Sequence, residues 1–92
     1  MGLIESGDLA QFLAEHPDWL FEDDAVQRTF QFADFAEALD FVNRVGEIAE
    51  AANHHPDIDI RWNRVRLRLT THSEGGLTEM DLAMAARIDG LI

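Results

Sequence analysis

Two adjacent runs of alternating residues limit the folds open to this chain more than any other feature of its sequence. Apolar residues alternate with charged ones in residues 58–62 and again in residues 64–69. A period of two is typical of a strand with one apolar and one polar face. With Asn63 between the runs, the pattern predicts a β-hairpin. Its apolar face has to be buried, so the hairpin requires covering elements from the rest of the chain.

The covering elements are predicted by helical patterns before and after the hairpin. Their starts are marked by capping patterns at Asp8, at Asp34 with Glu37, and at Thr78 with Asp81. After Asp34, apolar residues recur at helical spacing, and these are Phe35, Ala38, Leu39, Val42, Val45, Ala49 and Ala52. Pro56 ends this helix near residues 53–55, because the residue before a proline disfavours helical geometry. An alternating run over residues 26–32 predicts a strand, and a short strand is expected around residues 19–21.

The order of these elements predicts an α+β domain in which an antiparallel sheet carries helices on one side. Ninety-two residues leave room for one hydrophobic core, so residues 1–92 are interpreted as a single domain. A domain this small buries a limited share of its surface, and we therefore expect it to associate with further copies of itself.

The charge of the chain excludes some classes of partner. Its net charge is −11, from 18 acidic and 7 basic residues, which argues against nucleic acids and anionic membranes as partners. All 7 basic residues are arginine, and those within residues 61–68 are interpreted as the solvated face of the hairpin. The absence of cysteine excludes disulfides and cysteine-ligated zinc, and it fits a cytoplasmic location. No apolar run is long enough to span a bilayer.

Three of the 4 histidines lie within residues 50–81, together with two acids of interest. The residues concerned are Glu50, His54, His55, Pro56, Trp62, His72 and Asp81. Antiparallel pairing about a turn near Asn63 places residues 54–57 close to residues 70–72, so His72 returns to the histidine pair. Imidazole exchanges protons near neutral pH and also binds metal ions. The set therefore predicts a site for proton transfer or for a metal.

Two chemistries fit these residues, and several of them also have an ordinary structural explanation. One chemistry is general acid–base catalysis, without a metal, on a small polar substrate. The other is a three-histidine zinc site with Glu50 or Asp81 supporting the ligands. Taken singly, Asp81 is a helix cap, Trp62 is hairpin packing, and a His-His-Pro run is a loop. The hairpin favours a shared site because it gathers the residues in one region.

The ordered pattern also resembles the pterin-4a-carbinolamine dehydratase family. The resemblance runs from about Val26 to Leu91 and rests on Arg28-x-Phe30-x-Phe32-x-Asp34-Phe35, Ala49-Glu50, His54-His55-Pro56, Trp62-Asn63, Thr71-His72 and Gly76-Leu77-Thr78-x-x-Asp81. It implies a four-stranded antiparallel sheet with three helices packed on one face. It also implies dehydration of 4a-hydroxytetrahydropterin to quinonoid dihydropterin, which recycles tetrahydrobiopterin after aromatic amino-acid hydroxylation. Members use no metal or other cofactor, because the pterin is the substrate, and they assemble as dimers or tetramers.

The resemblance further implies roles for individual residues. His54 and His72 are the expected acid–base pair, and His55 is expected to hold the substrate and its hydroxyl. Asp81 is expected to orient His72 or to contact the pterin, and Glu50 is expected to support His54. The remaining residues expected to bind or support the substrate are Pro56, Trp62, Thr71 and Ser73. The alternative function is a non-catalytic interaction or dimerisation module that stabilises a partner protein.

Overall fold

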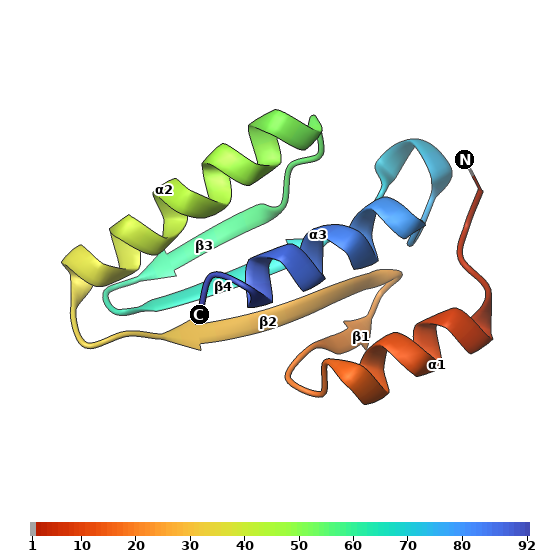
Figure 1. Cartoon of the computed structure of the whole chain (residues 1–92), viewed down its shortest axis with the longest axis horizontal. Coiled ribbons are helices and arrows are strands. Elements are labelled where there is room, and N and C mark those ends of the chain that lie inside the picture. Colours follow the sequence, from red (N-terminus) through yellow and green to blue (C-terminus); the bar gives the residue numbers. More distant parts are fainter. Residues whose placement is uncertain (1) are drawn as a thin grey trace.

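The computed structural model describes residues 2–92 and places a layer of helices over one antiparallel sheet (Figure 1). Its helices are α1 (Ser6–Glu15), α2 (Phe35–Ala52) and α3 (Glu79–Asp89), with a short 3₁₀ helix, η1 (His72–Glu74). Its strands are β1 (Leu20–Glu22), β2 (Ala25–Gln31), β3 (Asp57–Arg61) and β4 (Arg64–Leu69). The element order α-β-β-α-β-β-α, with four antiparallel strands, confirms the expected fold class.

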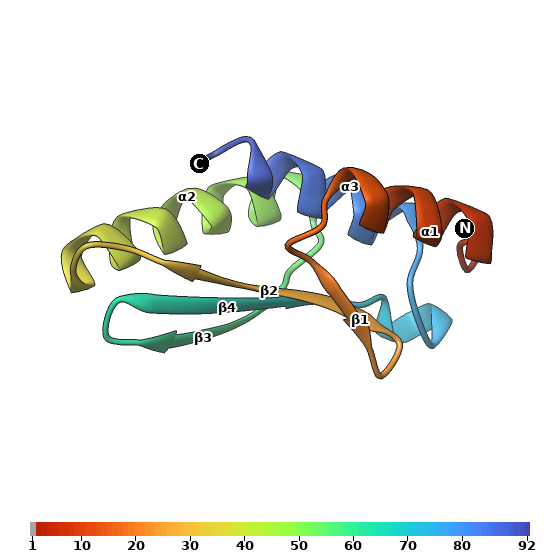
Figure 2. The same cartoon turned by 90° about the horizontal axis from the view of Figure 1, so that it is seen from below.

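The strands lie in the order β1-β2-β4-β3, and each neighbouring pair is antiparallel. In the central strand β4, Val65, Leu67 and Leu69 are fully buried, whereas the arginines between them point away from the core. The three helices cover the face that these apolar side chains form, as Figure 2 shows. Among residues 2–92, no helix lies over the opposite face of the sheet (Figure 2). Polar side chains from β2, β3 and β4 lie on that face, among them Thr29, Asp59 and Arg66.

The stripe that α2 buries is narrower than its apolar spacing predicts. Ala38, Phe41, Val45 and Ala49 are buried in the core. Phe35 and Leu39, which were expected on the same stripe, are 47% and 39% exposed because they lie to one side of it. As predicted, the Asp34 side chain caps the helix and accepts a hydrogen bond from the Glu37 backbone N–H at 2.8 Å.

The start of α1 differs from the sequence prediction. The helix begins at Ser6, and its N-cap is Glu5, whose side chain makes no capping hydrogen bond. Asp8 lies in the first turn instead, where its negative charge is favourable to the helix dipole. Within residues 2–92, no helix combines the length and the apolar content that crossing a bilayer requires.

The hairpin turn is held by Asn63. Its buried side-chain amide donates to the Phe32 carbonyl at 2.8 Å, and its own carbonyl accepts from the Phe32 N–H at 2.9 Å. Trp62, expected at the end of the first hairpin strand, lies in the turn with a φ of 50° and is 69% exposed. A positive φ is uncommon for a bulky residue, so we attribute this conformation to the two hydrogen bonds that fix its neighbour.

A polar cluster centred on Asp89 ties the end of α3 to β2 and to the segment after α1. The Asp89 carboxylate accepts hydrogen bonds from Trp19 Nε1 at 2.9 Å and Arg28 Nη1 at 2.7 Å, and it lies 2.7 Å from His16 Nδ1. The side chains of Arg28 and Asp89 are only 20% and 17% exposed. A carboxylate at a helix C-terminus opposes the helix dipole, so these donors are needed to keep it there.

Replacing Asp89 with alanine should lower the free energy of unfolding by roughly 2–4 kcal/mol, because it leaves Arg28 and Trp19 largely buried without their acceptor. Urea unfolding at fixed protein concentration measures the change. The matched control is Asp18→Ala. Asp18 lies 3.5 Å from Arg28 but is 71% exposed, so its loss should change stability by less than about 0.5 kcal/mol. Equal effects of the two substitutions would contradict a structural role for the cluster.

Gly46 in α2 offers a stabilising substitution. A Cβ built at this position meets no atom within 4 Å, so alanine fits without strain. Gly46→Ala should raise the free energy of unfolding by about 1 kcal/mol, because glycine is the poorer helix former. The midpoint of thermal unfolding should then rise by about 4–8 °C. Gly75→Ala is the contrasting variant, since Gly75 has a φ of 75°, and it should be destabilising. If Gly46→Ala is destabilising, the space around the Cβ position of residue 46 must be occupied by other atoms in solution.

Candidate functional site

The centre of the candidate site is a contact between His54 and Asp81. His54 follows the end of α2, and its Nε2 lies 2.5 Å from Asp81 Oδ1 on the first turn of α3. The Asp81 side chain is fully buried, and that of His54 is 10% exposed. A buried carboxylate is tolerated only when hydrogen bonds replace its water. As an ionised group Asp81 accepts only, which leaves Nε2 of His54 as the donor.

Two threonines donate hydrogen bonds to the second oxygen of the Asp81 carboxylate. Oδ2 accepts from Thr71 Oγ1 at 2.8 Å and from the Thr78 backbone N–H at 2.9 Å. The two threonine hydroxyls also lie 2.9 Å apart. Asp81 is therefore fixed by three hydrogen bonds that come from the end of α2, from the end of β4 and from its own helix.

Asp81 is a helix cap and a member of the site at the same time. With Thr78 it forms a capping box, as the sequence predicts, and the box sets the direction of the carboxylate at the start of α3. We expected Asp81 to orient His72 or to contact the pterin. The first expectation is wrong, because the Asp81 carboxylate contacts His54.

Glu50 likewise has a different partner from the one we expected. Its Oε2 lies 2.8 Å from Nε2 of His55, whereas we expected it to support His54. The reason is the end of α2, where Asn53 adopts the left-handed conformation with a φ of 50° and turns the chain out of the helix. The side chains of His55 and Glu50 are 55% and 82% exposed, so this contact contributes little to stability.

The return of the hairpin brings His72 to the same end of the sheet. Thr71, which binds Asp81, pairs with Gly76 as an isolated bridge, and η1 starts at His72. His72 and Ser73 are exposed in η1. Pro56 separates the histidine pair from β3 and is half-buried. His72 is thus one residue from the hydrogen-bond network that holds His54.

Trp62 is the one predicted site residue that the fold places elsewhere. It occupies the turn between β3 and β4. His54 and His55 precede β3 and His72 follows β4, so they lie at the opposite end of the hairpin. Within one chain Trp62 therefore does not join the histidines.

His54 also borders a small hollow between α2 and α3. The hollow has a volume of about 160 Å³ and is lined by Ala52, His54, Met80, Ala83, Met84 and Arg87. Among residues 2–92, no three His, Asp or Glu side chains are grouped as metal ligands. Within the described chain, then, the three histidines form no preformed zinc site.

Sequence reasoning missed the part that Thr78 plays in the site. The pattern identified it as a helix cap, and its hydroxyl also contacts Thr71 within the Asp81 network. Thr71, which was expected to bind or support the substrate, contacts Asp81 through its side chain. The capping pattern of Thr78 with Asp81 was the available sequence signal for this role. Because Asp81 also contacts His54, the residue that caps the helix with it can join the same hydrogen-bond network.

Comparison with known proteins agrees with this fold. The family model described as "Pterin 4 alpha carbinolamine dehydratase" matches residues 3–91. A protein of Chloroflexus aurantiacus, provisionally named a pterin-4-alpha-carbinolamine dehydratase, is 53% identical over 92 residues, covering 100% of this chain and 99% of its own. A provisionally named relative from Mycobacteroides abscessus is 46% identical over 89 residues and covers 97% and 95% of the two chains. The chain belongs to the pterin-4α-carbinolamine dehydratase family.

Solved structures show the same architecture. A "transcriptional coactivator/pterin dehydratase" from Brucella melitensis superposes with a TM-score of 0.92 at 33% identity and covers 98% of each chain. A pterin dehydratase-like protein described as a RuBisCO assembly factor of the α-carboxysome superposes with a TM-score of 0.66. Its identity is 24%, with 79% of this chain and 84% of its own covered, so it shows a shared fold alone.

Proposed function

We propose that this chain dehydrates 4a-hydroxytetrahydropterin to quinonoid dihydropterin by histidine acid–base catalysis without a metal. The observation that carries the proposal is the network from His54 through Asp81 to Thr71, the residue that precedes His72 in the chain. It supplies one imidazole fixed by a buried carboxylate, and the exposed imidazole of His72 follows the network at the same end of the hairpin. Membership of the family supports the pterin as the substrate.

The reaction needs two proton transfers at neighbouring atoms. The bond between C4a and the hydroxyl oxygen breaks, and the oxygen takes a proton and leaves as water. The N5–H bond also breaks, and its electron pair forms the C4a=N5 double bond. One acid and one base that exchange protons near neutral pH can perform both transfers, and imidazole suits either role.

The hydrogen bonds suggest how the two roles are divided. Because Nε2 of His54 donates to Asp81, neutral His54 presents the lone pair of Nδ1. In the proposed scheme His54 takes the N5 proton, and the Asp81 carboxylate stabilises the imidazolium that forms. His72 then protonates the leaving hydroxyl, and His55, backed by Glu50, holds that hydroxyl in place.

In the proposed scheme, Thr78 and the remaining predicted residues other than Trp62 have supporting roles. Thr71 and Thr78 fix Asp81, Pro56 directs the chain from the histidine pair into β3, and Ser73 offers a hydroxyl beside His72. Trp62 has no part in the scheme within one chain. No cofactor is required, since the pterin is the substrate, and the reaction would recycle tetrahydrobiopterin in the cytoplasm.

A homodimer or homotetramer is part of the proposal. β3 is an edge strand whose outer side is unpaired among residues 2–92, and exposed edges favour pairing between copies. Ile58 on this strand is 39% exposed, and Phe35 on α2 is 47% exposed. These apolar side chains gain stability if a second copy covers them.

A non-catalytic interaction module is the second candidate function. The Brucella relative is described as a transcriptional coactivator as well as a pterin dehydratase. The exposed Phe35 and Leu39 on α2 offer an apolar surface for a protein partner. This function predicts stoichiometric co-purification of a partner and no acceleration of dehydration.

The assay that separates the two follows the decay of freshly generated carbinolamine with the purified chain and with His72→Ala. Catalysis by the wild type and a loss of about 10²-fold or more in the variant support the dehydratase. A full rate in His72→Ala would remove His72 from the mechanism. Because His72 is exposed, its replacement should leave stability within about 0.5 kcal/mol of the wild type, so a loss of rate is not a loss of fold.

A further inference from the structure

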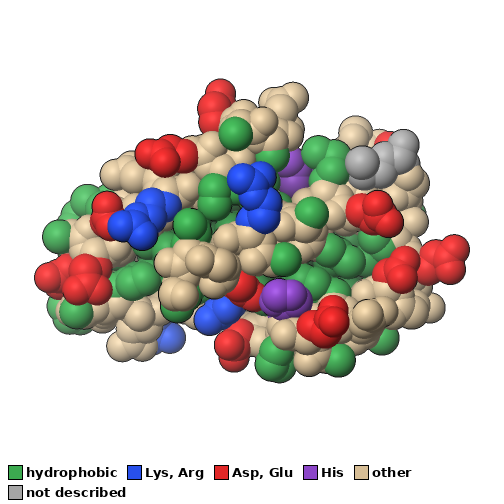
Figure 3. Space-filling model, viewed as in Figure 1, with side chains coloured by type: hydrophobic (Ala, Val, Ile, Leu, Met, Phe, Trp, Pro, Cys, Tyr) green, Lys and Arg blue, Asp and Glu red, His purple; other side chains and the backbone are tan. Residues whose placement is uncertain are grey.

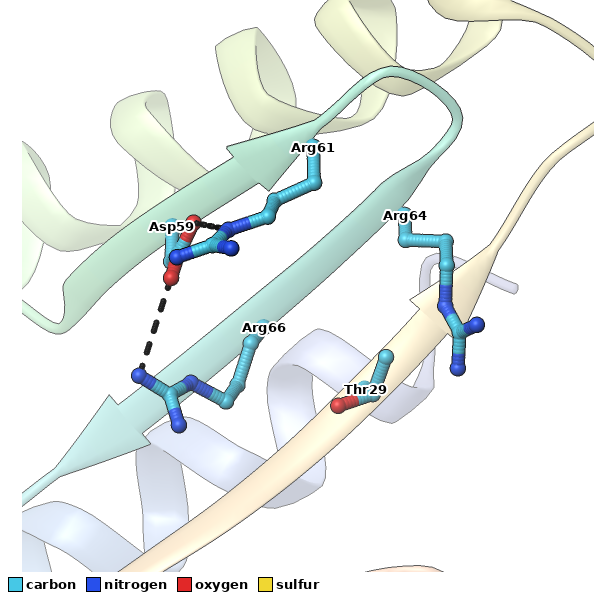
Figure 4. Close-up of a pocket in the computed structure, with 5 residues that line it drawn as sticks. All are labelled: Thr29, Asp59, Arg61, Arg64 and Arg66. Atoms are coloured by element: carbon cyan, nitrogen blue, oxygen red, sulfur yellow. Dashed lines mark hydrogen bonds and ion pairs between the residues drawn. The ribbon is translucent and has the colours of Figure 1, made fainter.

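A broad hollow lies on the face of the sheet that the helices leave uncovered, away from the histidines. It has a volume of about 430 Å³ and is lined by Thr29, Asp59, Arg61, Arg64 and Arg66. Figure 4 shows the side chains of Arg61 and Arg66 directed toward Asp59, while Arg64 extends from β4 toward β2. We call this surface the arginine hollow.

Strand register forces like charges together in the arginine hollow. Arg61 and Arg64 are direct partners across the β3–β4 ladder, and Asp59 faces Arg66 in the same ladder. Like charges directly opposite each other in an antiparallel pair are destabilising. A sequence that breaks a local rule without a compensating gain in folding often does so at a functional site.

The charges in the hollow do not balance. Asp59 is the single carboxylate of the lining, and it lies 3.3 Å from Arg61 Nε and 3.6 Å from Arg66 Nη2. Among residues 2–92, Arg64 makes no ion pair and no side-chain hydrogen bond. Three guanidinium groups therefore line the hollow beside one carboxylate, in a chain whose net charge is −11.

The positive charge of the arginine hollow contrasts with the charge on the other side of the molecule. On the helix side, acidic side chains lie around the rim of the molecule (Figure 3). The guanidinium group presents a planar fork of donors that matches phosphate and carboxylate oxygens. Thr29 on β2 adds a hydroxyl to the same hollow. The lining of the hollow therefore presents more hydrogen-bond donors than acceptors.

We propose that the arginine hollow is a binding site for a small molecule with a compact dianionic group, either a phosphate monoester or a dicarboxylate. The volume lies within the range of small-molecule sites. Long polyanions are disfavoured, because the net charge of the chain repels them beyond the hollow. The site is separate from the histidines, which lie at the other end of the hairpin.

The test is a titration of backbone amide shifts by NMR, with inorganic phosphate in one series and succinate in another at constant ionic strength. Saturable shifts at Thr29, Arg64 and Arg66 are expected in at least one series, and the series that saturates identifies the source of the dianion. Arg64→Gln should weaken that binding about tenfold, because it removes a charge-assisted donor. Arg44→Gln is the matched control, since Arg44 is an exposed arginine on α2 that pairs with Asp40, outside the hollow.

The possible results decide the proposal. Shifts that saturate with neither anion, or equal weakening by Arg44→Gln and Arg64→Gln, would overturn it, because general charge screening then explains the data. Arg64→Gln should dehydrate the carbinolamine at the wild-type rate. A large loss of dehydration in this variant would show that the hollow is not separate from the histidine site. A wild-type chain that binds the anion but lacks dehydratase activity would refute the proposed function and leave this site standing.

Discussion

Dehydration of the carbinolamine should slow by about 10²–10⁴-fold when His54 is replaced by glutamine. Glutamine places an amide nitrogen near the position of Nε2, so it still donates a hydrogen bond to Asp81. It cannot accept a proton at neutral pH, and the proposed base is therefore lost while the buried carboxylate keeps a partner. The rate of carbinolamine decay under matched protein concentration measures the effect.

Two companion variants make this result interpretable. His54→Ala should lose the same activity and also destabilise the chain by about 1–3 kcal/mol, because one oxygen of Asp81 is left without a partner in a buried position. His16→Gln removes a histidine that contacts Asp89, outside the site, and should retain the full rate. Dehydration by His54→Gln at the wild-type rate would remove His54 from the chemistry.

The second large effect is expected for Asp81→Asn. The asparagine side chain keeps the size of aspartate, and its amide oxygen still accepts from Thr78 N–H, so the helix cap persists. Its NH₂ group then faces Nε2 of His54, which favours the tautomer with the proton on Nδ1. The proposed base is blocked, and we expect the rate to fall by about 10²-fold or more, with a loss of stability of roughly 1–2 kcal/mol.

Asp34→Ala separates capping from catalysis. Asp34 is the N-cap of α2, whereas Asp81 belongs to the capping box of α3; Asp34 is exposed and takes no part in the site. Its removal should lower the free energy of unfolding by about 1 kcal/mol and leave the dehydration rate unchanged. Comparable losses of rate in Asp34→Ala and Asp81→Asn would indicate that stability, rather than His54, accounts for both.

The architecture was predictable because each element carries a local signal. Alternation at Val65, Leu67 and Leu69 defined the face that the helices bury, and the capping residues Asp34 and Thr78 marked two helix starts correctly. These signals act between residues close in sequence. The hairpin then follows from a single turn, and the return of His72 toward the histidine pair follows from the hairpin.

The hydrogen-bond partners of Glu50 and Asp81 could not be predicted from local signals of this kind. Counting one helical turn from Glu50 to His54 assumes that the helix continues, but Asn53 ends it in the left-handed conformation. His54 then turns toward α3, and Glu50 meets His55 instead. The left-handed conformation of Asn53 thus decides which histidine contacts the buried carboxylate, and asparagine favours this conformation without requiring it.

Contacts between distant parts of the chain also lay beyond sequence reasoning. The Asp89 carboxylate accepts hydrogen bonds from Trp19 and Arg28, which lie far earlier in the chain. No residue near Asp89 in the sequence indicates these contacts. Trp62 was expected in a strand, yet the hydrogen bonds between Asn63 and Phe32 shift the turn by one residue. Both features depend on how elements pack, which composition and periodicity do not encode.

The central claim is that His54, held by Asp81, transfers a proton during dehydration of a 4a-hydroxytetrahydropterin. The most direct measurement is the first-order decay of freshly generated carbinolamine at increasing concentrations of wild-type chain and of His54→Gln. The proposed mechanism predicts a decay rate that rises in proportion to the wild-type concentration and stays at the spontaneous rate with the variant. A decay rate that does not depend on wild-type concentration, or one that rises equally with both proteins, would contradict it.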